Sequence, residues 1–138
     1  MSQTLTIIKP DAVGNGTAGR IIAQLESAGF TLRAARLMTM TPAQARSFYD
    51  VHRERPFYES LVAFMTSGPC IPMALEAPDA VRRLRQVIGA TDPAEADPGT
   101  VRALYAESKE RNAIHGSDSD ENARREIGFF FPECDRVG

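Results

Sequence analysis

The chain has 138 residues, of which 43% are hydrophobic and 25% charged, and this predicts one globular domain over residues 1–138. Its net charge of −2 argues against a nucleic-acid-binding surface spread over the protein, so no specific nucleic acid is expected as a partner. Because the sequence has no apolar stretch of roughly 20 residues, no signal-peptide pattern and only two cysteines, it predicts a cytoplasmic protein with reduced thiols and no membrane contact.

Strand and helix patterns alternate through the first half of the chain. Two stretches with alternating apolar side chains predict strands, at residues 4–8 and 30–38. Three stretches with apolar residues at helical spacing predict helices, at residues 18–28, 42–52 and around 61–65. The second of these helices begins with Thr41-Pro42-Ala43-Gln44, a capping-box pattern with proline at the first helical position.

The second half of the chain continues this alternation. Residues 70–75 predict a third strand, in which Pro72 indicates an edge position or a bulge. Helices are expected at residues 78–88, about 100–106 and after Ser119, with an irregular loop at 92–100. Residues 127–131 predict the fourth strand, so that Glu126 comes at the start of a strand. This order fits an α+β sandwich of the split βαβ type.

A glycine-rich segment, Gly14-Asn15-Gly16-Thr17-Ala18-Gly19, matches the G-x-G-x-x-G pattern of dinucleotide-binding proteins. In that fold the motif follows the first strand through a tight turn, whereas residues 9–13 intervene here. The second predicted strand carries Arg36 toward its end rather than an acidic residue for a ribose, and the chain is short for a doubly wound sheet. We therefore interpret the segment as a flexible entry to the first helix.

One of only two histidines lies in the run Asn112-Ala113-Ile114-His115-Gly116-Ser117-Asp118, a polar, glycine-containing stretch that predicts a tight turn. A histidine presented by a turn can act at pH 7 as a base, a ligand or a nucleophile. Glu126 lies eleven residues later, and a carboxylate can orient the ring and stabilise an imidazolium. A purely structural histidine is the other interpretation that this run allows.

Other residues have side chains suited to a phosphate or a base. Lys9 follows the first strand directly and can point into a cleft as a compact cation. Arg85 and Arg102 can each make two hydrogen bonds to a phosphate. Tyr49 and Phe57 flank a charged loop, and an aromatic ring at a loop edge can stack on a base. Taken singly, these cations are better explained as solvated surface charges, and Phe57 as a core residue.

Six short motifs, in order and without large gaps between residues 3 and 132, together resemble nucleoside diphosphate kinase. They are Ile8-Lys9-Pro10-Asp11, Arg55-Pro56-Phe57, Ser67-Gly68-Pro69, Gly89-Ala90-Thr91-Asp92-Pro93, Pro98-Gly99-Thr100-Val101-Arg102 and Arg111-Asn112-Ala113-Ile114-His115-Gly116-Ser117-Asp118. The resemblance implies a ferredoxin-like sandwich with a four-stranded antiparallel sheet covered by helices. It also implies a ping-pong reaction, in which His115 takes the γ-phosphoryl group of a nucleoside triphosphate such as ATP and passes it to a nucleoside diphosphate.

The resemblance further implies which residues bind the nucleotide: Lys9, Tyr49, Phe57, Arg85, Thr91, Arg102 and Asn112. Lys9 would contact the phosphate and a ribose hydroxyl, and Asn112 the sugar. Phe57 would stack on the base and Tyr49 would hydrogen-bond in the phosphate pocket. The remaining three would form a phosphate clamp.

By the same resemblance, Ser117 and Glu126 would support the histidine. Mg²⁺ would bridge the nucleotide phosphates with few protein ligands, so no metal site made by the protein itself is expected. The expected partners are nucleoside di- and triphosphates and further copies of the chain, as a tetramer or a hexamer. Two positions depart from the family pattern: Leu104 replaces a common acidic residue, and Lys109 replaces the apolar residue beside the base.

Two other classes of function remain to be weighed against an active kinase. One is a nucleotide-binding or regulatory protein on the same scaffold with little catalysis, and the other is a structural oligomeric module. A degenerate relative would be expected to have lost part of the residue set, yet the set is complete: Lys9, Arg85, Thr91, Arg102, Asn112, His115 and Glu126. This completeness favours the active kinase.

Overall fold

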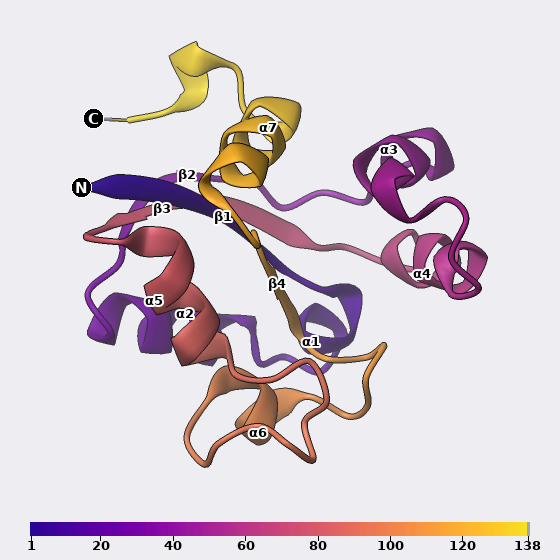
Figure 1. Cartoon of the computed structure of the whole chain (residues 1–138), viewed down its shortest axis with the longest axis horizontal. Coiled ribbons are helices and arrows are strands. Elements are labelled where there is room, and N and C mark those ends of the chain that lie inside the picture. The colour runs from indigo at the N-terminus through magenta and orange to yellow at the C-terminus, as the bar shows by residue number, and fades with distance from the viewer. Residues whose placement is uncertain (138) are drawn as a thin grey trace.

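The computed structural model describes residues 1–137 and contains a four-stranded antiparallel sheet with the strand order β2-β3-β1-β4 (Figure 1). The strands are β1 (Ser2–Ile8), β2 (Thr31–Ala35), β3 (Ile71–Ala77) and β4 (Ile114–Gly116). The predicted α+β sandwich with a four-stranded antiparallel sheet is therefore confirmed.

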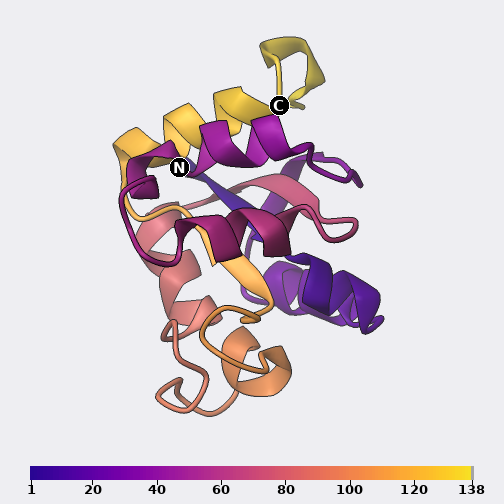
Figure 2. The same ribbon diagram turned by 90° about the vertical axis from the view of Figure 1, so that its right-hand side faces the viewer.

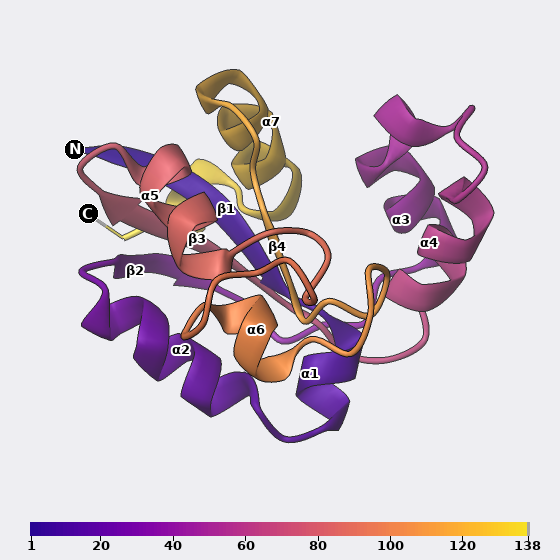
Figure 3. The same ribbon diagram turned by 60° about the horizontal axis from the view of Figure 1, so that its bottom comes forward.

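Helices lie on both faces of this sheet (Figures 1 and 2). One apolar cluster joins β1 to α7 (Asp120–Phe130), α3 (Pro42–Phe48) and α4 (Tyr58–Met65), the last two lying beyond the strand ends. A second cluster, on the other face, contains side chains of α1 (Pro10–Gly14), α2 (Ala18–Ser27), α5 (Ala80–Ile88) and α6 (Val101–Tyr105) (Figure 3). Among residues 1–137, no helix has the length and apolar character needed to cross a membrane.

The pairing of β4 with β1 decides which way its residues face. His115 is opposite Ile7, which belongs to the apolar cluster around α7 and α3. Gly116 faces the other way, against α5, where an added Cβ would come within 2.9 Å of the Cδ1 atom of Ile88. Glycine at this position therefore lets α5 lie directly on β4, while His115 is presented on the opposite face.

The prediction of a strand at residues 127–131 is wrong, because residues 127–130 continue helix α7 and Phe131 follows its end. The helix begins after Ser119, whose Oγ accepts a hydrogen bond from the backbone N–H of Asn122 at 3.1 Å. Its buried residues recur at helical spacing and are Ala123, Glu126, Ile127 and Phe130. Packing of this face on the sheet overrides the strand preference of consecutive phenylalanines.

The fourth strand instead lies within the run predicted as a turn. β4 has only three residues, and its pairing with β1 places His115 on a strand rather than in a loop. Glu126 correspondingly lies on a helix and not at the start of a strand. The backbone position of His115 is thus set by the pairing of β4 with β1.

Smaller differences concern element ends. The helix expected over 42–52 ends at Phe48, and a 3₁₀ turn η1 (Asp50–His52) follows it; a second, η2 (Glu133–Asp135), lies near the C-terminus. β2 ends at Ala35, before the predicted residue 38.

Pro72 lies in β3, an inner strand, rather than at an edge. Its carbonyl accepts from the N–H of Arg36 at 3.1 Å, so its missing N–H faces the segment just beyond the end of β2. Proline therefore removes no hydrogen bond from the regular part of the ladder, and this explains how it is accommodated between two strands.

Candidate active site

A pocket of about 690 Å³ lies where α3 and α4 face β4 and the loop before it. Nine of the ten predicted site residues line it: Lys9, Tyr49, Phe57, Arg85, Thr91, Arg102, Asn112, His115 and Glu126. The tenth, Ser117, is fully buried and hydrogen-bonded to Glu126. The structure thus brings the whole predicted set together from six separate segments of the chain.

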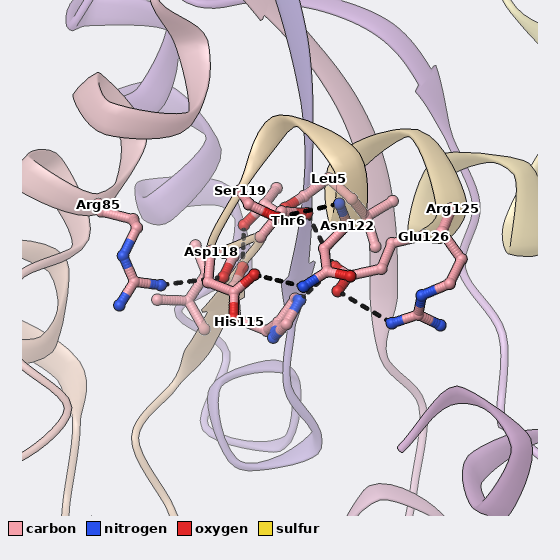
Figure 4. A network of polar contacts seen from close by, with 12 residues as sticks. Leu5, Thr6, Arg85, His115, Asp118, Ser119, Asn122, Arg125 and Glu126 are labelled. Carbon is pink, nitrogen blue, oxygen red and sulfur yellow. Dashed lines mark hydrogen bonds and ion pairs between the residues drawn. The ribbon is translucent and has the colours of Figure 1, made fainter. Parts of the chain in front are cut away.

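His115 is held by a buried carboxylate at the base of this pocket (Figure 4). Its Nε2 lies 2.7 Å from Oε1 of Glu126, and the Ser117 hydroxyl donates to the same oxygen at 2.8 Å. An ionised carboxylate only accepts hydrogen bonds, so Nε2 carries the hydrogen and Nδ1 keeps a lone pair that accepts no hydrogen bond from residues 1–137. The ring is therefore held through Nε2, and Nδ1 is its hydrogen-bond acceptor.

The aromatic side chains of α3 and of its C-terminal cap support this histidine. The Phe48 ring packs edge-on against His115, with ring centroids 5.6 Å apart. The hydroxyl of Tyr49 is buried, with no hydrogen-bond partner among the residues the structure describes. Burial, with the nearby charge of Glu126 adding to it, raises the pKa of Tyr49 well above its usual value. This hydroxyl therefore stays protonated and is able to donate to a ligand.

Lys9 is also buried, with 7% of its surface exposed. Its Nζ donates to Oδ1 of Asn112 at 2.8 Å, and the Asn112 amide donates to the carbonyl of Thr91 at 3.3 Å. Burial, and after it the charge of Arg102, lowers the pKa of Lys9 to about 8. Lys9 is thus a charged donor at pH 7, linked to the predicted sugar and phosphate contacts.

Two guanidinium groups lie beside the carbonyls that flank His115. Arg102 donates to the carbonyls of Ile114 at 2.8 Å and Gly89 at 3.0 Å, and Arg85 donates to that of Gly116 at 3.4 Å. Burial and the charge of Arg85 lower the pKa of Arg102 to about 10, so Arg102 remains charged at pH 7. The two guanidinium groups repel each other, and a bound polyanion would offset that repulsion.

Phe57 stands at the mouth of the pocket, 46% exposed, beside the ring of His52. This partly exposed position differs from that of a core residue. Across the pocket, Lys109 is largely exposed, and its Nζ lies 4.0 Å from Asp92. Leu104 is exposed and does not line the pocket, so only the departure at Lys109 bears on it.

Sequence reasoning missed several lining residues. His52, expected at a surface helix end, borders the pocket, and so do Asp118, Asn122 and Arg125. In Figure 4, Asn122 donates to Asp118 at 2.6 Å, and this hydrogen bond lowers the pKa of the Asp118 carboxyl. Because Asn122 and Arg125 share a helical face with Glu126, assigning α7 as a helix would have identified them.

Comparison with known proteins gives one consistent family. The sequence model of the nucleoside diphosphate kinase family matches residues 2–136. Nucleoside diphosphate kinase of Chlorobium limicola is 57% identical over 131 residues, which cover 95% of this chain and 94% of that protein. The enzyme of Desulfatibacillum aliphaticivorans is 49% identical over the full length of both chains.

Solved structures agree with these relatives. The nucleoside diphosphate kinase of Aquifex aeolicus superposes with a TM-score of 0.97 at 45% identity, over 99% of each chain. The halophilic enzyme of Halobacterium salinarum, solved in complex with CDP, gives a TM-score of 0.95 at 38% identity, over 99% of this chain and 91% of that one. Both the fold and the sequence therefore match this group of enzymes.

Proposed function

Because the chain belongs to the nucleoside diphosphate kinase family, and so transfers the γ-phosphoryl group of a nucleoside triphosphate to a nucleoside diphosphate, we propose that His115 carries this group between the two nucleotides. The observation that carries the proposal is the hydrogen bond between Nε2 of His115 and Glu126, which leaves Nδ1 without a partner among residues 1–137, in a pocket whose lining includes Lys9, Arg85 and Arg102. The full predicted residue set argues against a purely regulatory or structural member of the family.

In the first half-reaction, the Nδ1 lone pair attacks the γ-phosphorus, the Nδ1–P bond forms, and the bond from phosphorus to the β-phosphate oxygen breaks. Glu126 stabilises the positive charge that develops on the ring. Arg85, Arg102 and Lys9 neutralise the negative charge spread over the phosphates, which is the main demand of phosphoryl transfer. A second nucleoside diphosphate then attacks the phosphohistidine by the reverse path.

The remaining contacts would position the nucleotide. Phe57, at the mouth of the pocket, would stack on the base, which recognises any base because each has an aromatic face. Asn112 and Lys9 would bind the sugar, and the protonated hydroxyl of Tyr49 would donate to the phosphates. Lys109 would add a cation, rather than an apolar cover, on the other side of the base.

A kinase acting on nucleotides requires a divalent metal ion, and we propose Mg²⁺. The ion would be carried mainly by the nucleotide phosphates, because Mg²⁺ at such sites takes only one or two carboxylates from the protein. Asp118, a lining carboxylate beside His115, would help to hold it. The ion would offset phosphate charge when bound.

Exposed apolar side chains support a homo-oligomer, as either a tetramer or a hexamer. Leu37 and Phe129 are at least one-third exposed, and neighbouring subunits would cover such surfaces. We also propose that residues 1–138 form one domain and that the enzyme acts in the cytoplasm.

Labelling tests the proposed intermediate directly. Incubation with γ-³²P-labelled ATP and Mg²⁺ is expected to leave one acid-labile phosphate on each chain, because a phosphoramidate forms on His115. Addition of unlabelled dGDP should then remove this label and yield labelled dGTP. Absence of the label, or an acid-stable label, would contradict the assignment.

Lys9 makes the affinity for nucleotides depend on pH. Its charged form binds phosphate, so kcat/KM is expected to fall as the pH rises through about 8, the pKa of Lys9 in the free enzyme. Its contribution to stability changes in the opposite direction, because above pH 8 the unfolded chain binds this proton more tightly than the folded one. The titration of Lys9 therefore does not itself destabilise the folded chain in this pH range.

Profiles of kcat/KM between pH 6.5 and 9.5 would measure this effect. In Lys9→Met the limb near pH 8 should disappear at a lower overall activity, since no lysine is left to titrate. A limb that persists unchanged in Lys9→Met would assign it to another group.

A further inference from the structure

Asp11 is a buried carboxylate that the mechanism above does not use. It is 3% exposed, lies in the first turn of α1 and does not line the nucleotide pocket. One oxygen accepts from the backbone N–H of Ala113 at 3.0 Å, across 102 residues of sequence. The other has no hydrogen-bond partner among residues 1–137. A carboxylate buried with so few partners is costly to the fold, which points to a specific role.

Its partner, Ala113, has a backbone conformation that alanine rarely adopts. The φ angle of Ala113 is +73°, in the left-handed region that favours glycine. Both backbone polar groups of Ala113 are held by the segment after β1: Asp11 accepts from its N–H, and the N–H of Lys9 donates to its carbonyl at 2.8 Å. Such a conformation persists when its surroundings over-determine it.

Ala113 connects two parts of the site. Asn112, immediately before it, accepts from Lys9 and donates to the carbonyl of Thr91, and β4 with His115 begins immediately after it. The positive φ of Ala113 thus sets the direction in which the chain passes from Asn112 into β4, and with it the position of the Asn112 side chain.

We propose that Asp11 is a positioning residue, which holds Ala113 in its left-handed conformation and so fixes Asn112 and Lys9 at the nucleotide pocket. The proposal rests on the binding roles assigned above to these two residues. Asp11 is also one of the charges around Lys9, together with Glu110 and Arg102. The two carboxylates favour the charged form of the lysine and the guanidinium disfavours it.

Asp11→Ala tests whether Asp11 holds the conformation of Ala113, and the added substitution Ala113→Gly should rescue this variant. The single variant is expected to lose about 10- to 100-fold in kcat/KM, because the contacts of Asn112 are misplaced. Glycine adopts a positive φ without steric cost, so the double variant Asp11→Ala/Ala113→Gly should recover to within about threefold of wild type. Ala113→Gly alone should differ little from wild type.

Asp11→Asn tests the effect of the Asp11 charge on Lys9. It also keeps the proposal testable if Asp11→Ala fails to fold. The amide oxygen still accepts from Ala113, so the fold and kcat at pH 7 should be kept. The missing charge should move the alkaline limb of kcat/KM to lower pH. Glu26→Gln, a matched change on the exposed face of α2, should leave the limb in place.

Two outcomes would overturn the proposal: wild-type kcat and KM in Asp11→Ala after correction for the folded fraction, or a double variant as impaired as the single one. An unmoved limb in Asp11→Asn would contradict the effect on Lys9. The Asp11 variants should still accept one acid-labile phosphate, more slowly. A wild-type enzyme that accepts none would contradict His115 as the nucleophile instead, so the two failures are distinguishable.

Discussion

Replacing His115 with alanine is expected to lower kcat by at least about 10³-fold, because it removes the nucleophile of the proposed covalent intermediate. The acid-labile label should be absent after incubation with labelled ATP. Nucleotide affinity should stay within about tenfold of wild type, since Lys9, Arg85 and Arg102 keep the backbone and side-chain contacts that hold them. Calorimetry with ADP would measure the affinity separately from the chemistry.

The second histidine provides the matched control for this experiment. His52 borders the same pocket, but its ring lies beside Phe57, whereas the ring that contacts Glu126 is that of His115. His52→Ala should therefore still accept the acid-labile phosphate, whatever its effect on KM. Labelling that persists in His115→Ala and disappears in His52→Ala would reverse the assignment.

Much of the site could be predicted because its residues carry chemistry at motif spacing. The run around His115 and the lysine after the first strand were both recognisable from the sequence, and both reach the pocket. What the sequence left open was whether His115 meets Glu126, because contact between a strand and a helix depends on packing and not on spacing. The 2.7 Å contact between Nε2 and Oε1 answers that question.

The errors of prediction have one physical origin. Residues 127–131 are rich in phenylalanine, which suits a strand as well as a buried helix face, and short apolar runs do not separate the two. The true fourth strand, Ile114–Gly116, contains a glycine and a histidine and is only three residues long, so its own composition favoured a turn. Pairing with β1, a contact across more than 100 residues, makes it a strand.

Asp11 was part of a recognised motif, yet its role could not be read from the sequence. An aspartate after proline is a common way to begin a helix. Only the fold reveals that its carboxylate reaches the N–H of Ala113 and that this alanine has a positive φ. Residues that act through another backbone segment are the ones that motif reading misses.

Arg102→Lys is expected to lower kcat/KM by about 100-fold although it keeps the positive charge. The guanidinium of Arg102 bonds two carbonyls at once, of Gly89 at the end of α5 and Ile114 at the start of β4. A lysine ammonium has no planar fork and would leave one of these carbonyls without its donor. The charge would then sit away from the phosphates, and β4 would lose a link to α5.

Stability should change with activity in this variant. A carbonyl left without its buried donor costs about 1–3 kcal/mol, which denaturant unfolding would detect. Arg82→Lys is the matched control, because Arg82 lies on the exposed face of α5 and pairs with Asp79 at the surface. It should change neither kcat/KM nor the free energy of unfolding. If Arg102→Lys also kept wild-type values, a point charge would suffice, and the planar geometry would have no part in holding the phosphates beside His115.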